Sequence, residues 1–238
     1  MTTGIVFAHG ITVTGFDYAN PLISNLHLEL LPYVRPAVLQ WAGPSGILDY
    51  ISAWELLVKR PIPPWYRPLA RFNAPFIRES HEAFWWTRSY ERKGIHDRCM
   101  AYIKDRLMQE LQEGSDQLVV VGHSLGSVVL VDALTAMIAD TSIHKGQIKA
   151  IVTMGSPLSA WVDPQELAII CNKLVDGTKW VNVWDLNDPV ASPINPVCPQ
   201  IQDLEVRTGD IFTSHGGYWP SKEVAAIIHE FLKEEPHA

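Results

Sequence analysis

Cysteine is scarce in this chain of 238 residues, which holds only Cys99, Cys171 and Cys198. The three lie far apart and form no C-x-x-C pair, so the sequence indicates neither a zinc knuckle nor a disulfide framework. We therefore expect three reduced thiols and a cytoplasmic protein.

Long apolar runs and basic clusters are also missing. The first apolar run, at residues 5–8, is too short for a signal peptide, and no basic residue precedes it. No stretch approaches the roughly 18 apolar residues that a membrane-spanning helix needs. The formal net charge is −7, which gives no reason to expect a nucleic-acid partner. We therefore expect neither a transmembrane segment nor nucleic-acid binding.

Apolar runs alternate with helical patterns along the chain, which predicts a single α/β domain over residues 1–238. We expect strands at 4–8, 37–41, 118–121, 148–153 and 180–184, a weaker one at 204–206, and helices at 20–31, 94–113 and 221–234. Short apolar strands separated by helices favour a mostly parallel sheet with helices on both faces. Such sheets bind ligands at the carboxyl ends of their strands.

The segment 44–93 differs from the rest of the chain. It contains four of the nine tryptophans, six prolines, and eight Lys or Arg against five Asp or Glu. We interpret it as a helical cap inserted over the active edge of the sheet. Its aromatic side chains favour an apolar acyl or aromatic substrate, or else they only pack the cap onto the sheet. An amphipathic cap would also allow contact with a membrane surface.

The strongest motif is Gly-His-Ser-Leu-Gly at 122–126, between an apolar strand and an apolar helix. A sharp strand-to-helix turn holds the middle serine in a strained conformation, with its side chain projecting from the edge of the sheet. Gly122 and Gly126 remove side chains that would collide with neighbouring backbone. Ser124 is therefore the predicted nucleophile.

Two backbone N–H groups are expected to hold the oxyanion of the reaction. Leu125 opens the helix after the nucleophile, where the N–H groups and the helix dipole favour negative charge. Ile11 follows the His-Gly step at the end of the first strand and would supply the second donor. We interpret His9 and His123 as structural residues.

A serine nucleophile needs a histidine base and an acid that fixes its tautomer, in the chain order Ser, acid, His. His215 is the predicted base because it lies in a Gly-rich loop before the last helix. Asp188 and Asp185 both follow the strand at 180–184. We favour Asp188, with Asp163 and Asp210 as more distant alternatives.

Taken together, the motifs resemble those of lipase/esterase-type α/β-hydrolases. The matching pieces are residues 8–10, 122–126, 154–158, 187–190 and 214–216. This resemblance implies a triad of Ser124, Asp188 and His215, oxyanion donors at Ile11 and Leu125, no metal and no organic cofactor. It does not imply a particular substrate, because this fold hosts many.

The expected activity is cleavage of a small-molecule carboxylic ester through an acyl-enzyme on Ser124. A thioesterase, amidase or acyltransferase would use the same triad, and a third possibility is a binding protein that has kept the fold without catalysis. The sequence leaves the oligomeric state open.

Overall fold

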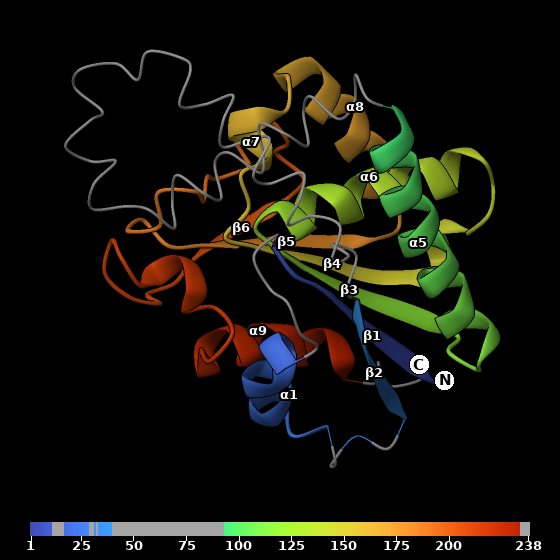
Figure 1. Ribbon diagram of the computed structural model, residues 1–238, viewed down its shortest axis with the longest axis horizontal. Coiled ribbons are helices and arrows are strands. Elements are labelled where there is room, and N and C mark those ends of the chain that lie inside the picture. Colours follow the sequence, from blue (N-terminus) through green and yellow to red (C-terminus); the bar gives the residue numbers. More distant parts are fainter. Residues whose placement is uncertain (11–16, 29–30, 32, 40–92, 234–238) are drawn as a thin grey trace.

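Six parallel strands form one sheet in the order β2-β1-β3-β4-β5-β6 (Figure 1). The computed structural model describes residues 1–10, 17–28, 31, 33–39 and 93–233. The strands are β1 (Thr3–Ala8), β2 (Val34–Leu39), β3 (Gln117–His123), β4 (Ile148–Met154), β5 (Lys179–Trp184) and β6 (Gln202–Glu205). The expected parallel sheet is confirmed.

Helices cover both faces of this sheet. Figure 1 shows α5, α6, α7 and α8 on one side and α1 with α9 on the other. The α-helices are α1 (Asn20–Leu26), α5 (Lys93–Gln112), α6 (Leu125–Ala139), α7 (Leu158–Trp161), α8 (Pro164–Leu174) and α9 (Lys222–Leu232). Among the described residues, three short 3₁₀ helices are η1 (Asp17–Ala19), η3 (Lys145–Gln147) and η4 (Ser214–Gly216).

The strands are apolar on both faces, which is why both faces must be covered. In β1, Val6 and Ala8 pack into the core under α5, α6 and α8. Ile5 and Phe7, which alternate with them, pack into the core under α1 and α9. Every residue of β1 is buried, so the strand lies inside the molecule along its whole length.

All six strands end at one edge of the sheet because they run in parallel. Ala8 pairs with Gly122 across β1 and β3, and Gly122 pairs with Thr153 across β3 and β4. The chain runs from β1 outward to β2 and then returns to β3 on the other side of β1. The loops after β1 and β3 therefore diverge, and this is the point where open parallel sheets place their ligands.

Three element boundaries differ from the sequence expectation. The helix expected at 20–31 ends at Leu26, because His27 adopts a left-handed conformation (φ 49°) and closes the helix with its N–H on Ser24. The strand expected at 37–41 begins earlier, at Val34, and is described as far as Leu39. The weak strand expected at 204–206 is β6, which begins at Gln202.

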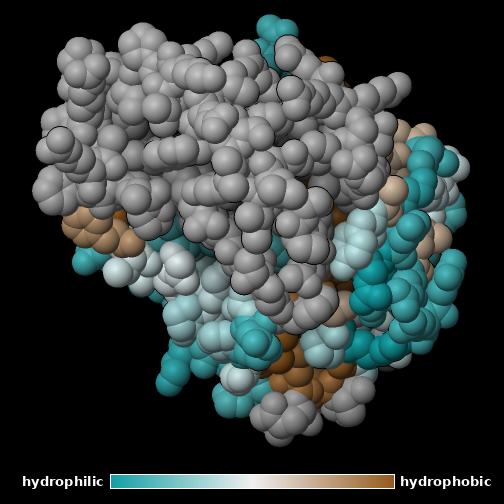
Figure 2. Space-filling view, in the orientation of Figure 1, coloured by the Kyte–Doolittle hydropathy of each residue, from teal (hydrophilic) through white to brown (hydrophobic). Residues whose placement is uncertain are grey.

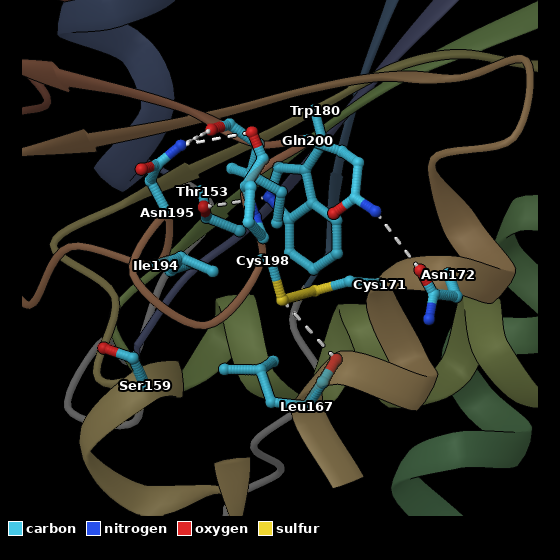
Figure 3. The surroundings of a disulfide bond; sticks show 12 residues. Thr153, Ser159, Leu167, Cys171, Asn172, Trp180, Ile194, Asn195, Cys198 and Gln200 are labelled. Atoms are coloured by element: carbon cyan, nitrogen blue, oxygen red, sulfur yellow. Dashed lines mark hydrogen bonds between the residues drawn. A yellow bond between two sulfur atoms is a disulfide. The ribbon is translucent and has the colours of Figure 1, made fainter. Parts of the chain in front are cut away.

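The expectation of three reduced thiols is wrong. Cys171 on α8 and Cys198 in the loop before β6 form a disulfide, with their Cα atoms 6.2 Å apart (Figure 3). Both side chains are buried beside the Trp180 indole in the core. The fold brings together two cysteines 27 residues apart, which no spacing rule detects. This pairing removes the thiol argument on which the cytoplasmic expectation rested.

Two expectations concern residues outside the described part of the chain. The cap at 44–93, with its suggested membrane contact, falls there except for Lys93, which begins α5. Ile11 also falls there. Within the described ranges, no helix combines the length and apolar character needed to cross a membrane.

Candidate active site

Ser124 occupies the turn between β3 and α6, at the carboxyl edge of the sheet. Its φ of 54° and ψ of −134° lie in a region that few non-glycine residues adopt. Such a conformation costs about 1–3 kcal/mol and persists only where the surroundings impose it. The Ser124 N–H donates to the Met154 carbonyl oxygen at 3.0 Å, which ties the turn to the end of β4.

The two glycines of the motif are required by close backbone contacts. A Cβ on Gly122 would lie 2.6 Å from the Cα of Ser127. A Cβ on Gly126 would lie 2.1 Å from the carbonyl oxygen of His9. Both distances are far below van der Waals contact, so the collision expected from the motif is confirmed. The absence of these side chains lets α6 start directly against β1.

Three of the predicted site residues lie within hydrogen-bond distance of one another. His215, in η4, places its Nε2 at 3.0 Å from the Ser124 Oγ. Its Nδ1 lies 3.0 Å from Oδ1 and 2.9 Å from Oδ2 of Asp188. The Asp188 carboxylate is fully buried, and the His215 side chain is 13% exposed. This is the geometry by which a carboxylate orients an imidazole toward a hydroxyl.

Asp185, the alternative acid, has other partners. Its carboxylate accepts hydrogen bonds from the backbone N–H groups of Asn187 and Thr208, at 2.8 and 2.6 Å. Arg207 forms an ion pair with it at 3.4 Å. These bonds join the loop after β5 to the loop that leads to His215. Asp185 therefore holds the two loops together, while Asp188 contacts the imidazole.

The two more distant alternatives also have structural roles. Asp163 accepts from the N–H groups of Gln165 and Glu166 and so caps the start of α8. Asp210 accepts from the N–H groups of Phe212 and Thr213 in the turn before η4. Among the described hydrogen bonds, neither carboxylate binds His215.

The surroundings of Asp188 favour its ionised form. Burial alone would raise the pKa of this carboxyl. Hydrogen bonding and charge from His215, with further donors at Val190 N–H and Tyr218 OH, outweigh burial and lower the pKa below its usual value. The carboxylate is therefore ready to stabilise a protonated imidazole.

His123 and His9, interpreted as structural from the sequence, lie buried beside Ser124. Burial and the neighbouring His215 lower the pKa of His123 to about 3, so it is neutral at physiological pH. Its Nε2–H donates to the carbonyl oxygen of His215 at 2.7 Å, which fixes the backbone of the base. Burial also lowers the pKa of His9, whose ring packs edge-on against Tyr18.

Of the two predicted oxyanion donors, Leu125 lies in the described part of the chain. Leu125 is the first residue of α6, where a helix has N–H groups without intrahelical acceptors. The other donor, Ile11, lies outside the described residues. Its neighbour Gly10 is described, and a Cβ there would lie 3.0 Å from the Cβ of Ser124. The end of β1 thus reaches Ser124.

Two further residues lie next to Asp188, the candidate acid. Tyr218 donates its hydroxyl to Asp188 Oδ2 at 2.9 Å. Gly155 has a φ of 57°, and a Cβ on it would lie 3.1 Å from the same oxygen. Gly155 belongs to the Met-Gly-Ser-Pro-Leu piece of the resemblance, which implied a part in shaping the pocket but no position next to the acid. No sequence signal marked Tyr218.

Exposed apolar side chains gather on the two loops that carry Asp188 and His215. Leu186 is 63% exposed, Ile211 51% and Phe212 67%. The loops are joined by a hydrogen bond from the Asn187 side chain to the Gly209 carbonyl oxygen. Figure 2 shows a brown, apolar surface at the left of the molecule, where Figure 1 places the chain before η4.

The described residues contain no group of three or more His, Cys, Asp or Glu side chains that could hold a metal ion. The chemistry that the described groups support is proton transfer between Ser124 and His215, with Asp188 as the orienting charge.

The parallel sheet, its helical layers and the turn at Ser124 define an α/β-hydrolase fold. A comparison with known families agrees: the PGAP1-like alpha/beta domain family matches residues 88–180, a stretch from α5 to the start of β5 that includes the nucleophile turn. Neither the curated proteins nor the solved structures contain a match. Fold and family match together indicate a hydrolase of the α/β class.

Proposed function

We propose that this protein is a serine hydrolase that cleaves carboxylic esters through an acyl-enzyme on Ser124. The observation that carries the proposal is the continuous hydrogen-bonded chain from Ser124 through His215 to the buried Asp188. Acyl transfer needs each of these groups, and a purely structural turn has no use for a strained, glycine-flanked serine.

In the first half of the reaction, His215 Nε2 takes the proton of Ser124 as Oγ attacks the ester carbonyl carbon. The carbonyl oxygen becomes an anion that the N–H groups of Leu125 and Ile11 stabilise. The bond from carbon to the alcohol oxygen then breaks, and the alcohol leaves with the proton held by His215. The acyl group remains on Ser124 as an ester.

In the second half, water attacks the acyl carbon and gives a proton to His215. The tetrahedral intermediate collapses, the carbon–Oγ bond breaks, and Oγ recovers the proton. The carboxylic acid is released and the site returns to its starting state. Asp188 stays ionised throughout and stabilises the imidazolium in both halves. No organic cofactor or metal enters these steps.

The substrate is proposed to be a small-molecule ester with an apolar acyl or aromatic part. Exposed Leu186, Ile211 and Phe212 next to the triad loops support an apolar substrate. Burial of apolar surface is worth about 0.8 kcal/mol per CH₂ group. If the site binds an apolar acyl chain, kcat/KM should therefore rise along a series of p-nitrophenyl esters of increasing acyl length.

The proposal is tested with a fluorophosphonate probe and with the same ester series. We expect wild-type protein to be labelled, and Ser124→Ala to lose labelling and on the order of 10⁶-fold in kcat. Ser142→Ala is the matched control, because Ser142 lies beyond α6 at the opposite end of the sheet. Equal labelling or equal hydrolysis by wild type and Ser124→Ala would refute the proposal. An added alcohol acceptor separates a hydrolase, which yields only free acid, from an acyltransferase.

A further inference from the structure

Tyr218 bridges the two aspartates that follow β5. Its hydroxyl oxygen lies 2.9 Å from the backbone nitrogen of Asp185 and 2.9 Å from Oδ2 of Asp188. A backbone N–H can only donate, so the hydroxyl accepts from Asp185. Its single hydrogen is then directed at the Asp188 carboxylate. The direction of both hydrogen bonds is therefore fixed by chemistry.

The ring that carries this hydroxyl is held on several sides. Tyr218 is completely buried in the loop between η4 and α9. A Cβ on Gly155 would lie 2.9 Å from the Tyr218 Cε2, so a glycine is needed at that position to admit the ring. The His123 ring packs against it, with centroids 5.7 Å apart. The hydroxyl is consequently presented to Asp188 from a rigid support.

Each oxygen of Asp188 receives one donor besides His215. The Val190 N–H donates to Oδ1 at 2.9 Å, and Tyr218 donates to Oδ2. A carboxylate torsion has a broad energy minimum, so a single donor would leave the plane of the group free to turn. Two donors on opposite oxygens fix that plane, and both oxygens then face Nδ1 of His215.

We propose that Tyr218 is a positioning residue of the triad, which orients the Asp188 carboxylate toward His215. This inference rests on the proposed function and deepens it. Tyr218 acts through Asp188 and does not touch the reacting atoms. The phenol remains a donor throughout the working pH range, since burial and the adjacent Asp188 charge raise its pKa further above the ordinary value.

The first test is Tyr218→Phe, which removes the hydroxyl and keeps the ring. We expect kcat to fall about ten- to hundredfold, the rate equivalent of one hydrogen bond to a charged group, with little change in KM. The acid limb of kcat/KM should move to higher pH, because a carboxylate that loses a donor holds a proton on the His215–Asp188 pair more strongly. His123, whose ring centroid lies 4.8 Å from that of His215, and Asp185, whose charge acts on Tyr218, are titratable groups next to this pair, and His9 acts on His123.

Tyr33→Phe is the matched control, because Tyr33 lies just before β2, at the opposite end of the sheet from the triad. A double-mutant cycle with Asp188→Asn adds a test of mechanism. In that background Tyr218→Phe should cost little further rate, since no charged carboxylate is left to orient. Full additivity of the two substitutions, or an unchanged kcat and pH profile in Tyr218→Phe, would overturn the inference.

Thermal melting shows whether Tyr218→Phe is folded at the assay temperature. If it is not, 3-fluorotyrosine at position 218 keeps the shape and makes the hydroxyl a stronger donor. The acid limb should then move to lower pH, and an unmoved limb would contradict the inference. If Tyr218 had only a structural role, the two variants would not move the acid limb in opposite directions.

One readout does not depend on catalysis. The proton on Nδ1 of His215 gives a downfield NMR resonance when it is held against a carboxylate. We expect Tyr218→Phe to shift or broaden it, whereas Tyr33→Phe leaves it in place. If wild type cleaves no ester but the resonance responds, the proposed function fails and the positioning role stands. If wild type is active and neither rate nor resonance responds, only the role of Tyr218 fails.

Discussion

At the scale of single residues, two carboxylates three positions apart have taken different tasks. Asp188 accepts from Tyr218 and faces His215, whereas Asp185 binds the backbone N–H groups of the loop around Thr208. Sequence reasoning favoured Asp188 without excluding Asp185, because both follow the same strand. Only the direction in which the turn after β5 points the two side chains separates them.

We therefore expect two matched variants to differ in what they lower: one mainly lowers kcat and the other mainly lowers the free energy of unfolding. Asp188→Asn should lower kcat by on the order of 10⁴-fold, because the amide would orient the wrong imidazole tautomer. Asp185→Asn should cost about 1.5–3 kcal/mol in the free energy of unfolding, the value of hydrogen bonds to a charged group, with a much smaller loss of kcat. Ester hydrolysis and urea unfolding of both variants measure this. A larger kcat loss in Asp185→Asn than in Asp188→Asn would reverse the assignment.

At the scale of elements, the parts that the sequence predicted well are the buried ones. β1, β3, β4 and β5 appear as short apolar runs because parallel strands are covered on both faces, and the helix at α9 shows its apolar stripe. One helix boundary was predicted wrongly because a single residue determines where that helix ends. The helix α1 stops at Leu26 because His27 adopts a left-handed conformation, which no periodicity reveals.

The disulfide is a second element-scale feature that the sequence did not reveal. It links α8 to the loop between Asp188 and β6, so it closes a segment from Cys171 to Cys198 that contains Asp188. Closing a loop of 27 residues is worth about 3–4 kcal/mol through the lost entropy of the unfolded chain. Trp180 and Leu167 surround the bond (Figure 3), so its site is buried and formed in the folded protein.

We therefore expect the double variant Cys171→Ala/Cys198→Ala to unfold at lower urea concentration, with a loss of about 3–4 kcal/mol. Thiol titration of denatured wild-type protein without reductant should find one thiol per chain instead of three. Three thiols, or an unchanged urea midpoint in the double variant, would show that the pair is not bonded. Cys99→Ala is the control for replacing a cysteine that this bond does not use.

At the scale of the whole molecule, the order of the motifs along the chain predicted most of the candidate site. The candidate nucleophile and base each follow a strand of one parallel sheet, so Ser124 and His215 could be predicted from chain order, and they lie with Asp188 in one hydrogen-bonded chain. The order of motifs along the chain does not predict which loops contact one another. Tyr218 reaches Asp188, and His123 reaches the His215 backbone, through side-chain packing that depends on the completed fold.

The same packing should make the whole molecule sensitive to acid. His123 is kept neutral by burial, with its pKa lowered to about 3, while in the unfolded chain it takes up a proton near pH 6.5. Between these values the unfolded state binds more protons than the folded state, so stability rises with pH and is lost as pH falls. One such group contributes about 1.4 kcal/mol per pH unit. His9, also lowered by burial, acts in the same direction, and the lowered Asp188 adds its loss below about pH 4.

Urea unfolding at pH 7.5, 6.5, 5.5 and 4.5 measures this dependence. We expect wild-type stability to fall by about 2–3 kcal/mol between pH 6.5 and 4.5 on account of His123. His123→Gln should be less stable at pH 7.5, because it disturbs the hydrogen bond to His215, yet its stability should fall less steeply toward acid. The change in the free energy of unfolding with pH, and not its value at pH 7.5, reports on the protonation of His123. Identical slopes in the two proteins would mean that His123 takes up its proton in the folded state, and that its neutral imidazole is not what holds the backbone of the base.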